Sequence, residues 1–63
     1  MKNYTIEVEL KKVEGDNINN ITLTFETRVE SFDAAFMKAQ RYYTIAQAEE
    51  GAEGKRIEVW ERQ

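Results

Sequence analysis

The chain has 63 residues, enough for one small domain, with twelve Asp and Glu against nine Lys and Arg and a net charge of −3. It contains neither Cys nor His, which excludes a disulfide framework, thiolate or imidazole metal ligands, and a Ser-His or Cys-His catalytic pair. We therefore expect no metal and no cofactor, and a core so small that self-association, most simply as a homodimer, helps to stabilise it.

The residues from Tyr4 to Lys11 alternate between apolar and polar side chains, a period typical of a half-buried strand. The alternation slips at Lys11-Lys12-Val13, which predicts a bulge or the approach to a turn. Gly, Asp and Asn in the segment 14–17 favour that turn. A second alternating run, from Ile21 to Val29, completes an antiparallel hairpin. The side chains expected to face the core are Tyr4, Ile6, Val8 and Leu10, and then Ile21, Leu23, Phe25, Thr27 and Val29.

A helix is predicted from Phe32 to Glu50, with Ser31 as N-cap, Asp33 in the first turn and Gly51 as C-cap. At 100° per residue, large aromatic residues and alanines cluster on one side, and we expect this side to pack on the sheet. Phe36 is expected to face Phe25 across the core. The predicted core face of the helix comprises Phe32, Ala35, Phe36, Ala39, Tyr43 and Ala46, with Tyr42 at its edge.

The segment from Lys55 to Arg62 reads as a third strand, with Ile57 and Val59 pointing inward. The predicted fold, a single domain over residues 1–63, is α+β: two strands, a helix and a strand, with the helix packed on one face of a mainly antiparallel sheet. We favour the strand order 2-1-3, because the uniform alternation of the first strand suits a central position. The alternative order 1-2-3 would make the second and third strands parallel through a right-handed crossover.

The sheet face away from the helix gathers carboxylates from all three strands. Glu7, Glu9, Glu26 and Glu58 are predicted to share this face and to form a negative patch. Trp60 joins them, because Ile57 and Val59 point the other way. An exposed Trp is a common anchor at protein interfaces, so these five residues are a candidate partner-binding site. The alternative is an ordinary solvated face on which Trp60 covers its neighbours.

The side of the helix opposite its core face carries a second candidate surface. Met37, Arg41 and Ile45 fall on one stripe there, where a surface helix usually has Lys, Glu and Gln. Apolar residues flanking an Arg predict a dimer seam or a partner site. The alternative is a scatter of exposed apolar residues without a role. The open edges of the sheet offer a second route to dimerisation.

Other functions are disfavoured by the residues themselves. Gly51-Ala52-Glu53-Gly54 has the spacing of a phosphate-binding Gly-x-x-Gly loop, but three nearby Glu would repel phosphate, so direct nucleic-acid binding is not expected. Acid-base catalysis needs an enclosed carboxyl group, which a flat sheet face does not provide, so we expect no enzyme. Neither a signal peptide nor the ~20-residue apolar run of a membrane span is visible, which favours a cytoplasmic protein.

The order strand-strand-helix-strand between about Tyr4 and Glu61, the small size, the acidity and the lack of Cys resemble small phage-encoded inhibitors of uracil-DNA glycosylase. The resemblance implies an acidic protein that mimics DNA and engages a DNA-repair enzyme in the host cytoplasm. No site residue is carried over from it. We expect a non-catalytic protein-binding module, an acidic inhibitor or modulator of a basic or DNA-binding host protein. The alternative is a structural or assembly protein whose role is homo-oligomerisation.

Overall fold

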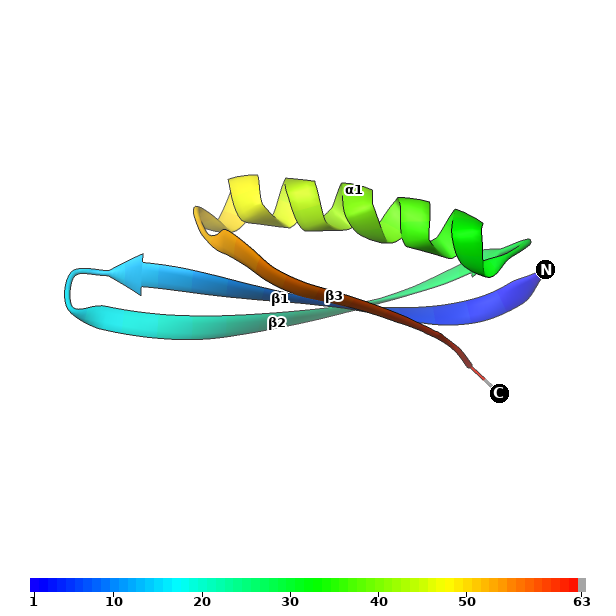
Figure 1. The fold of residues 1–63 in the computed structure, drawn as a ribbon, viewed down its shortest axis with the longest axis horizontal. Coiled ribbons are helices and arrows are strands. Elements are labelled where there is room, and N and C mark those ends of the chain that lie inside the picture. The colour runs from blue at the N-terminus through cyan, green and yellow to red at the C-terminus, as the bar shows by residue number, and fades with distance from the viewer. Residues whose placement is uncertain (63) are drawn as a thin grey trace.

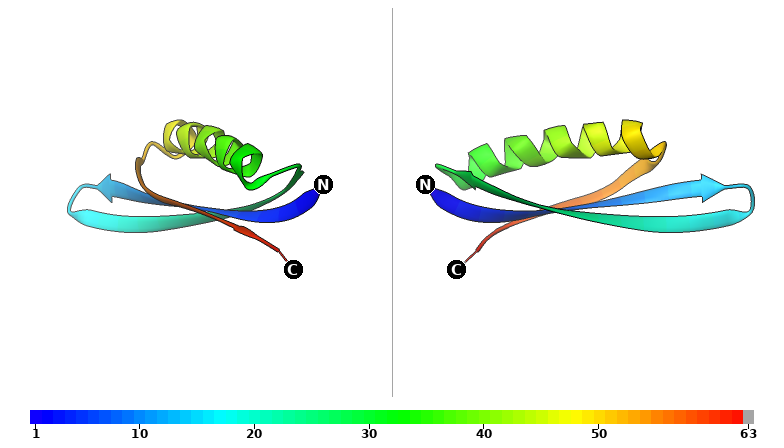
Figure 2. Two further views of the ribbon diagram at one scale, coloured as in Figure 1. Left: turned by 45° about the vertical axis from the view of Figure 1, so that its right-hand side comes forward. Right: turned by 180° about the vertical axis from the view of Figure 1, so that it is seen from behind.

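A computed structural model of the chain describes residues 1–62. Within them, three strands and one helix follow in the order β1 (Lys2–Glu14), β2 (Asn17–Val29), α1 (Phe32–Glu50) and β3 (Glu53–Glu61). The strands form one antiparallel sheet in the order β2-β1-β3, and α1 lies across one face of it (Figures 1 and 2). This arrangement confirms the predicted α+β fold and the preferred strand order. We call the face under α1 the inner face and the opposite one the outer face.

β1 is the central strand, and its inner side chains form the most deeply buried row of the protein. Tyr4, Ile6, Val8 and Leu10 are 2% exposed or less. A strand with neighbours on both sides and a helix above it loses nearly all contact with water on that face, whereas an edge strand stays partly open. The regular apolar alternation of β1 therefore belongs at the centre of the sheet.

The hairpin between β1 and β2 closes through a two-residue turn at Gly15 and Asp16. Gly15 has a φ of 61°, and no residue other than glycine has a positive φ among residues 1–62, so the φ of Asp16 is not positive. A positive φ at only the first central position matches a type II′ turn. The pairing runs without a break from Lys2↔Val29 to Glu14↔Asn17. Of the two alternatives predicted for residues 11–13, the bulge is therefore wrong and the approach to a turn is confirmed, because β1 ends at Glu14. The irregularity lies instead toward β3, between Glu9 and Leu10.

The far end of this hairpin extends beyond the rest of the molecule (Figure 1). Thirteen residues in a strand span ~43 Å, while the 19 residues of α1 span only ~28 Å. β3 reaches no further along β1 than Lys11. Residues 12–19, here called the hairpin arm, thus lack a third strand and a helix above them. Val13 and Ile18 pair within the arm on the outer face and remain 58% and 60% exposed.

Both ends of α1 are capped as the sequence predicts. The Ser31 hydroxyl accepts a hydrogen bond from the backbone N–H of Ala34 at 3.2 Å, and Gly51 ends the helix in the left-handed conformation, with φ 62°. Gln47 then connects the helix to β3. Its side-chain oxygen accepts from the N–H of Gly54 at 2.9 Å, while its backbone carbonyl accepts from Ala52 at 3.1 Å.

The helix meets the sheet through a narrower row than predicted. Ala35, Ala39 and Ala46 are buried, whereas Phe32 and Phe36 are 50% and 37% exposed. A single helix contacts a sheet along one line, and on α1 the residues on that line are alanines. The large side chains therefore lie to either side of the line. Phe32 lies over the end of β1, beside Tyr4.

The aromatic partner predicted for Phe25 is also wrong. The Phe25 ring packs on Tyr42 with its centroid 4.7 Å away, while Phe36 stacks on Phe32 at 6.3 Å. Tyr42 thus covers the β2 side of the core. Tyr43 covers the β3 side, where its ring fills the space that a Cβ on Gly54 would need.

These packing differences predict unequal costs for two Phe-to-Ala substitutions. Phe25→Ala removes a ring that packs against the core and Tyr42, and we expect it to lower the free energy of unfolding by ~3 kcal/mol. Phe36→Ala removes a ring that is 37% exposed, and we expect a loss of ~1 kcal/mol. Urea denaturation of both variants measures the difference. Equal losses would place Phe36 in the core after all.

Candidate protein-binding surfaces

The outer face brings together the four carboxylates predicted to lie on it. Glu7 and Glu9 come from β1, Glu26 from β2 and Glu58 from β3, and the register places Glu7 directly opposite Glu58. Two like charges facing each other across antiparallel strands destabilise the pair unless a cation lies between them.

Arg56 supplies that cation. Its guanidinium lies 3.3 Å from Glu58 Oε1, 3.7 Å from Glu9 Oε2 and 4.0 Å from Glu7 Oε1. Lys55, the extra residue at the β3 irregularity, approaches the same Glu9 at 3.6 Å, and Arg62 pairs with Glu26. The carboxylates share one face as predicted, but they form a charge-compensated network and not a bare negative patch.

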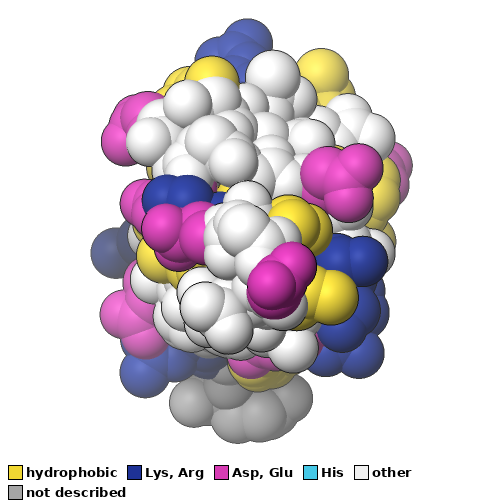
Figure 3. All heavy atoms as spheres, turned by 90° about the vertical axis from the view of Figure 1, so that its left-hand side faces the viewer, with side chains coloured by type: hydrophobic (Ala, Val, Ile, Leu, Met, Phe, Trp, Pro, Cys, Tyr) yellow, Lys and Arg dark blue, Asp and Glu magenta, His cyan; other side chains and the backbone are white. Residues whose placement is uncertain are grey.

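The sequence reasoning missed two of these cations for different reasons. Arg56 follows the same alternation as Glu58 and Trp60, so strict parity would have placed it on the outer face. Lys55 breaks that parity, because the irregularity between Glu9 and Leu10 adds one residue to β3 and turns this side chain toward Glu9. Figure 3 views the molecule from the hairpin end and shows acidic and basic side chains interspersed at that end as well.

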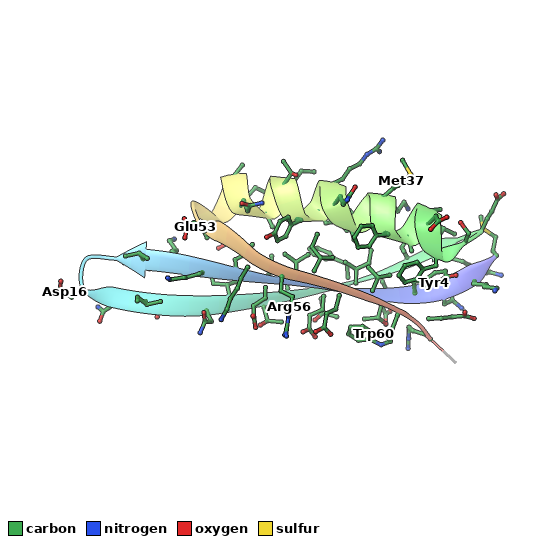
Figure 4. The ribbon with its side chains drawn as sticks, in the orientation of Figure 1. Tyr4, Asp16, Met37, Glu53, Arg56 and Trp60 are labelled. Atoms are coloured by element: carbon green, nitrogen blue, oxygen red, sulfur yellow. The ribbon has the colours of Figure 1, made fainter. Side chains whose placement is uncertain are left out.

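Trp60 lies on the outer face, as predicted, and is 43% exposed (Figure 4). Its partner across the strands is Thr5, which is only 8% exposed although it too belongs to the outer face. Trp60 and the Arg62–Glu26 pair flank Thr5 and account for this burial. The indole therefore covers a neighbour with part of its surface and presents the remainder to solvent.

An apolar groove opens on the inner face between α1 and β2. It encloses about 440 Å³ and has Leu23 and Phe25 as its floor, with Tyr42, Ile45 and Ala46 as its wall. Glu49 and Glu50 line its end near the helix C-terminus. The groove exists because α1 lies over β1 and β3, so the apolar row of β2 is only half covered. Sequence reasoning assigned Leu23 and Phe25 to a closed core and so missed this opening.

The predicted stripe holds together, because Met37, Arg41 and Ile45 line one shallow depression on the solvent side of α1. Met37 is 65% exposed and points away from the sheet above α1 (Figure 4). Ile45, 52% exposed, also lines the groove beside β2. Ile45 therefore joins the stripe on the solvent side of the helix to the apolar groove beside β2.

Comparison with protein-family models, with curated proteins and with solved structures found no match. In residues 1–62, no three acidic side chains gather closely enough to hold a metal ion. The one helix described there is too polar to cross a membrane.

The network around Arg56 predicts a salt-dependent loss of stability when this residue is replaced. Arg56→Ala leaves Glu7 facing Glu58 without a cation between them, and we expect it to lower the free energy of unfolding by about 1 kcal/mol at low salt. Salt screens the repulsion, so the loss should shrink at high ionic strength. The control is Arg41→Ala, the same change on the solvent side of α1. Denaturation at two salt concentrations compares them, and equal effects would contradict a bridging role for Arg56.

Proposed function

We propose that this protein is a non-catalytic module that acts by binding another protein chain through the groove between α1 and β2. The supporting observation is the groove itself, an apolar opening of about 440 Å³ next to a free strand edge. Exposed apolar surface bordered by charged residues is typical of interaction sites, and a peptide or strand can add to a free edge while its side chains enter the groove.

The charges of the outer face favour the groove over that face as the principal site. Its carboxylates already pair with Arg56, Lys55 and Arg62, so a basic partner would have to compete with cations of the same chain. Such exposed pairs contribute little stability individually, but together they reduce the negative field that would steer a basic partner. The absence of His and Cys supports a binding role without chemistry.

The groove can be tested with two matched helix variants. Ile45→Glu adds a charge at the groove wall, and Gln40→Glu adds the same charge at an exposed position of the same helix. We expect proteins retained from a cell lysate by the tagged wild type to be retained by Gln40→Glu and lost by Ile45→Glu, because a buried charge without a partner opposes binding. Circular dichroism confirms the fold of both variants. Undiminished retention by Ile45→Glu would overturn the proposal.

A second candidate function is the inhibition of a basic or DNA-binding enzyme through the outer face. The supporting observation is Trp60, whose 43% exposed side chain lies near the half-exposed carboxylates of Glu26 and Glu58. An indole of this kind acts as an apolar anchor, while the carboxylates steer the encounter.

Uracil excision by uracil-DNA glycosylase is the direct assay of this second candidate. We expect Trp60→Ala to weaken inhibition by about tenfold or more and Glu26→Gln with Glu58→Gln to weaken it most at low salt. Neutral substitutions are preferable to Lys at Glu7 and Glu9, where a new cation would lie beside Arg56 and Lys55. Wild-type protein that leaves excision unchanged would remove this candidate and leave the groove proposal standing.

A further inference from the structure

The backbone groups of β2 that face away from the sheet can be identified from the pairing. The N–H of Arg62 donates to the carbonyl of Asn3 at 2.7 Å, so the odd-numbered residues of β1 direct their backbone groups toward β3. The even-numbered residues of β1 therefore direct their backbone groups toward β2, where they face odd-numbered residues, as in Ile6↔Phe25. The even-numbered residues of β2, from 18 to 28, consequently direct their N–H and C=O groups to the open edge.

This edge is complementary to itself. When β2 is placed antiparallel to a second β2 about its central residue, Leu23, all 13 residues overlap. Leu23 then meets Leu23 of the second copy, and Ile21 meets Phe25 on the inner face. On the outer face Thr22 meets Thr24, a favourable cross-strand pair. The strand has two charges, and in this register Glu26 meets Asn20 while Arg28 meets Ile18, so no like charges face each other.

We propose that β2 pairs with β2 of a second copy about a two-fold axis at Leu23, forming a continuous six-stranded sheet. This inference rests on the proposed function and names a second copy of this chain as the occupant of the groove edge. An axis perpendicular to the sheet keeps both helices on the same face. The floors of the two grooves then join, and the half-exposed row of Ile21, Leu23 and Phe25 becomes covered from the side that α1 leaves open.

The hairpin arm favours a second copy over an unrelated strand. The arm extends beyond α1 and β3 of its own chain, and β2 is an edge strand, so β1 is the one strand beside Asn17 to Asn20 in the described monomer. In the proposed register these residues lie along Glu26 to Val29 of the second copy, and the same contact repeats at the other end. Each arm thus lies beside the body of its partner, a reciprocity that only two identical strands provide.

Charge near the axis leads to a distinct dependence on salt. Glu49 lines the same groove as Leu23, so Glu49 of both copies approaches the axis and the two charges oppose association. Apolar contacts and backbone hydrogen bonds hold the strands together. We therefore expect the dimer to persist or to strengthen as salt rises, because screening weakens the repulsion. Binding of a basic partner by the outer face would weaken with salt.

A single introduced cysteine tests the position of the axis, because the chain has no Cys of its own. In the proposed register, residue 23 forms a non-hydrogen-bonded pair with its own copy, with Cβ atoms ~5 Å apart and within reach of a disulfide. Leu23→Cys should oxidise to a covalent dimer at micromolar concentration. Val59→Cys, a half-buried apolar position on the other edge strand, should stay monomeric on a non-reducing gel. Cross-linking through residue 59 and not residue 23 would overturn the proposal.

Sedimentation equilibrium of the unmodified protein tests the same inference without cysteine. Wild type should be dimeric at micromolar concentration, with at least as much dimer in 1 M NaCl. Thr22→Lys with Thr24→Lys places a Lys opposite a Lys of the second copy while both side chains point to solvent, so dimerisation should weaken about a hundredfold with the fold retained.

Gln40→Lys with Thr44→Lys on α1 is the matched control and should dimerise like wild type. A wild-type monomer throughout, or equal dimerisation of both double variants, would refute the pairing. Loss of lysate partners by Ile45→Glu would even then leave the proposed function intact.

Discussion

The close approach of the α1 alanines to β1 is the contact on which the remaining structure depends. Ala35, Ala39 and Ala46 have no bulk to hold the helix away, so it settles onto the row of Ile6, Val8 and Leu10. The inner side of the central strand is thereby fully buried, but the helix lies over β1 and β3 and leaves β2 half covered. Tyr42 and Tyr43 extend that cover to each side, and the apolar row of β2 remains partly open.

The two faces of the sheet therefore differ: the charges of the outer face are largely paired within the chain, whereas the inner face leaves apolar surface exposed. On the outer face, Arg56 and its neighbours compensate the carboxylates within the chain, so the net charge of −3 does not concentrate there. On the inner face, none of the described residues 1–62 completes the cover of Leu23 and Phe25. Contact with another protein chain is accordingly more favourable at β2 than over the carboxylates of the outer face.

Much of the fold follows from local signals in the sequence. Alternation defined the strands and their faces, Ser31 and Gly51 marked the helix ends, and the uniform apolar row of β1 indicated its central place. The exposure of Phe36 depends on where the helix axis lies above the sheet, which periodicity does not specify. The groove likewise depends on where the helix axis lies above the sheet. Lys55 reaches Glu9 through an irregularity in pairing that no local pattern records, so the compensation of the carboxylates was only partly predictable.

Gln47 has a consequence for the order in which the chain folds. β1 and β2 meet across a two-residue turn, whereas β3 pairs with β1 residues about fifty positions earlier, a closure that costs more entropy. The Gln47 side chain and carbonyl can hold Gly54 and Ala52 only after the last helical turn has formed. We therefore expect β3 to join the sheet after the hairpin has formed. Release of β3 would uncover β1, and the hydrogen bonds from Gly54 and Ala52 to Gln47 oppose that release.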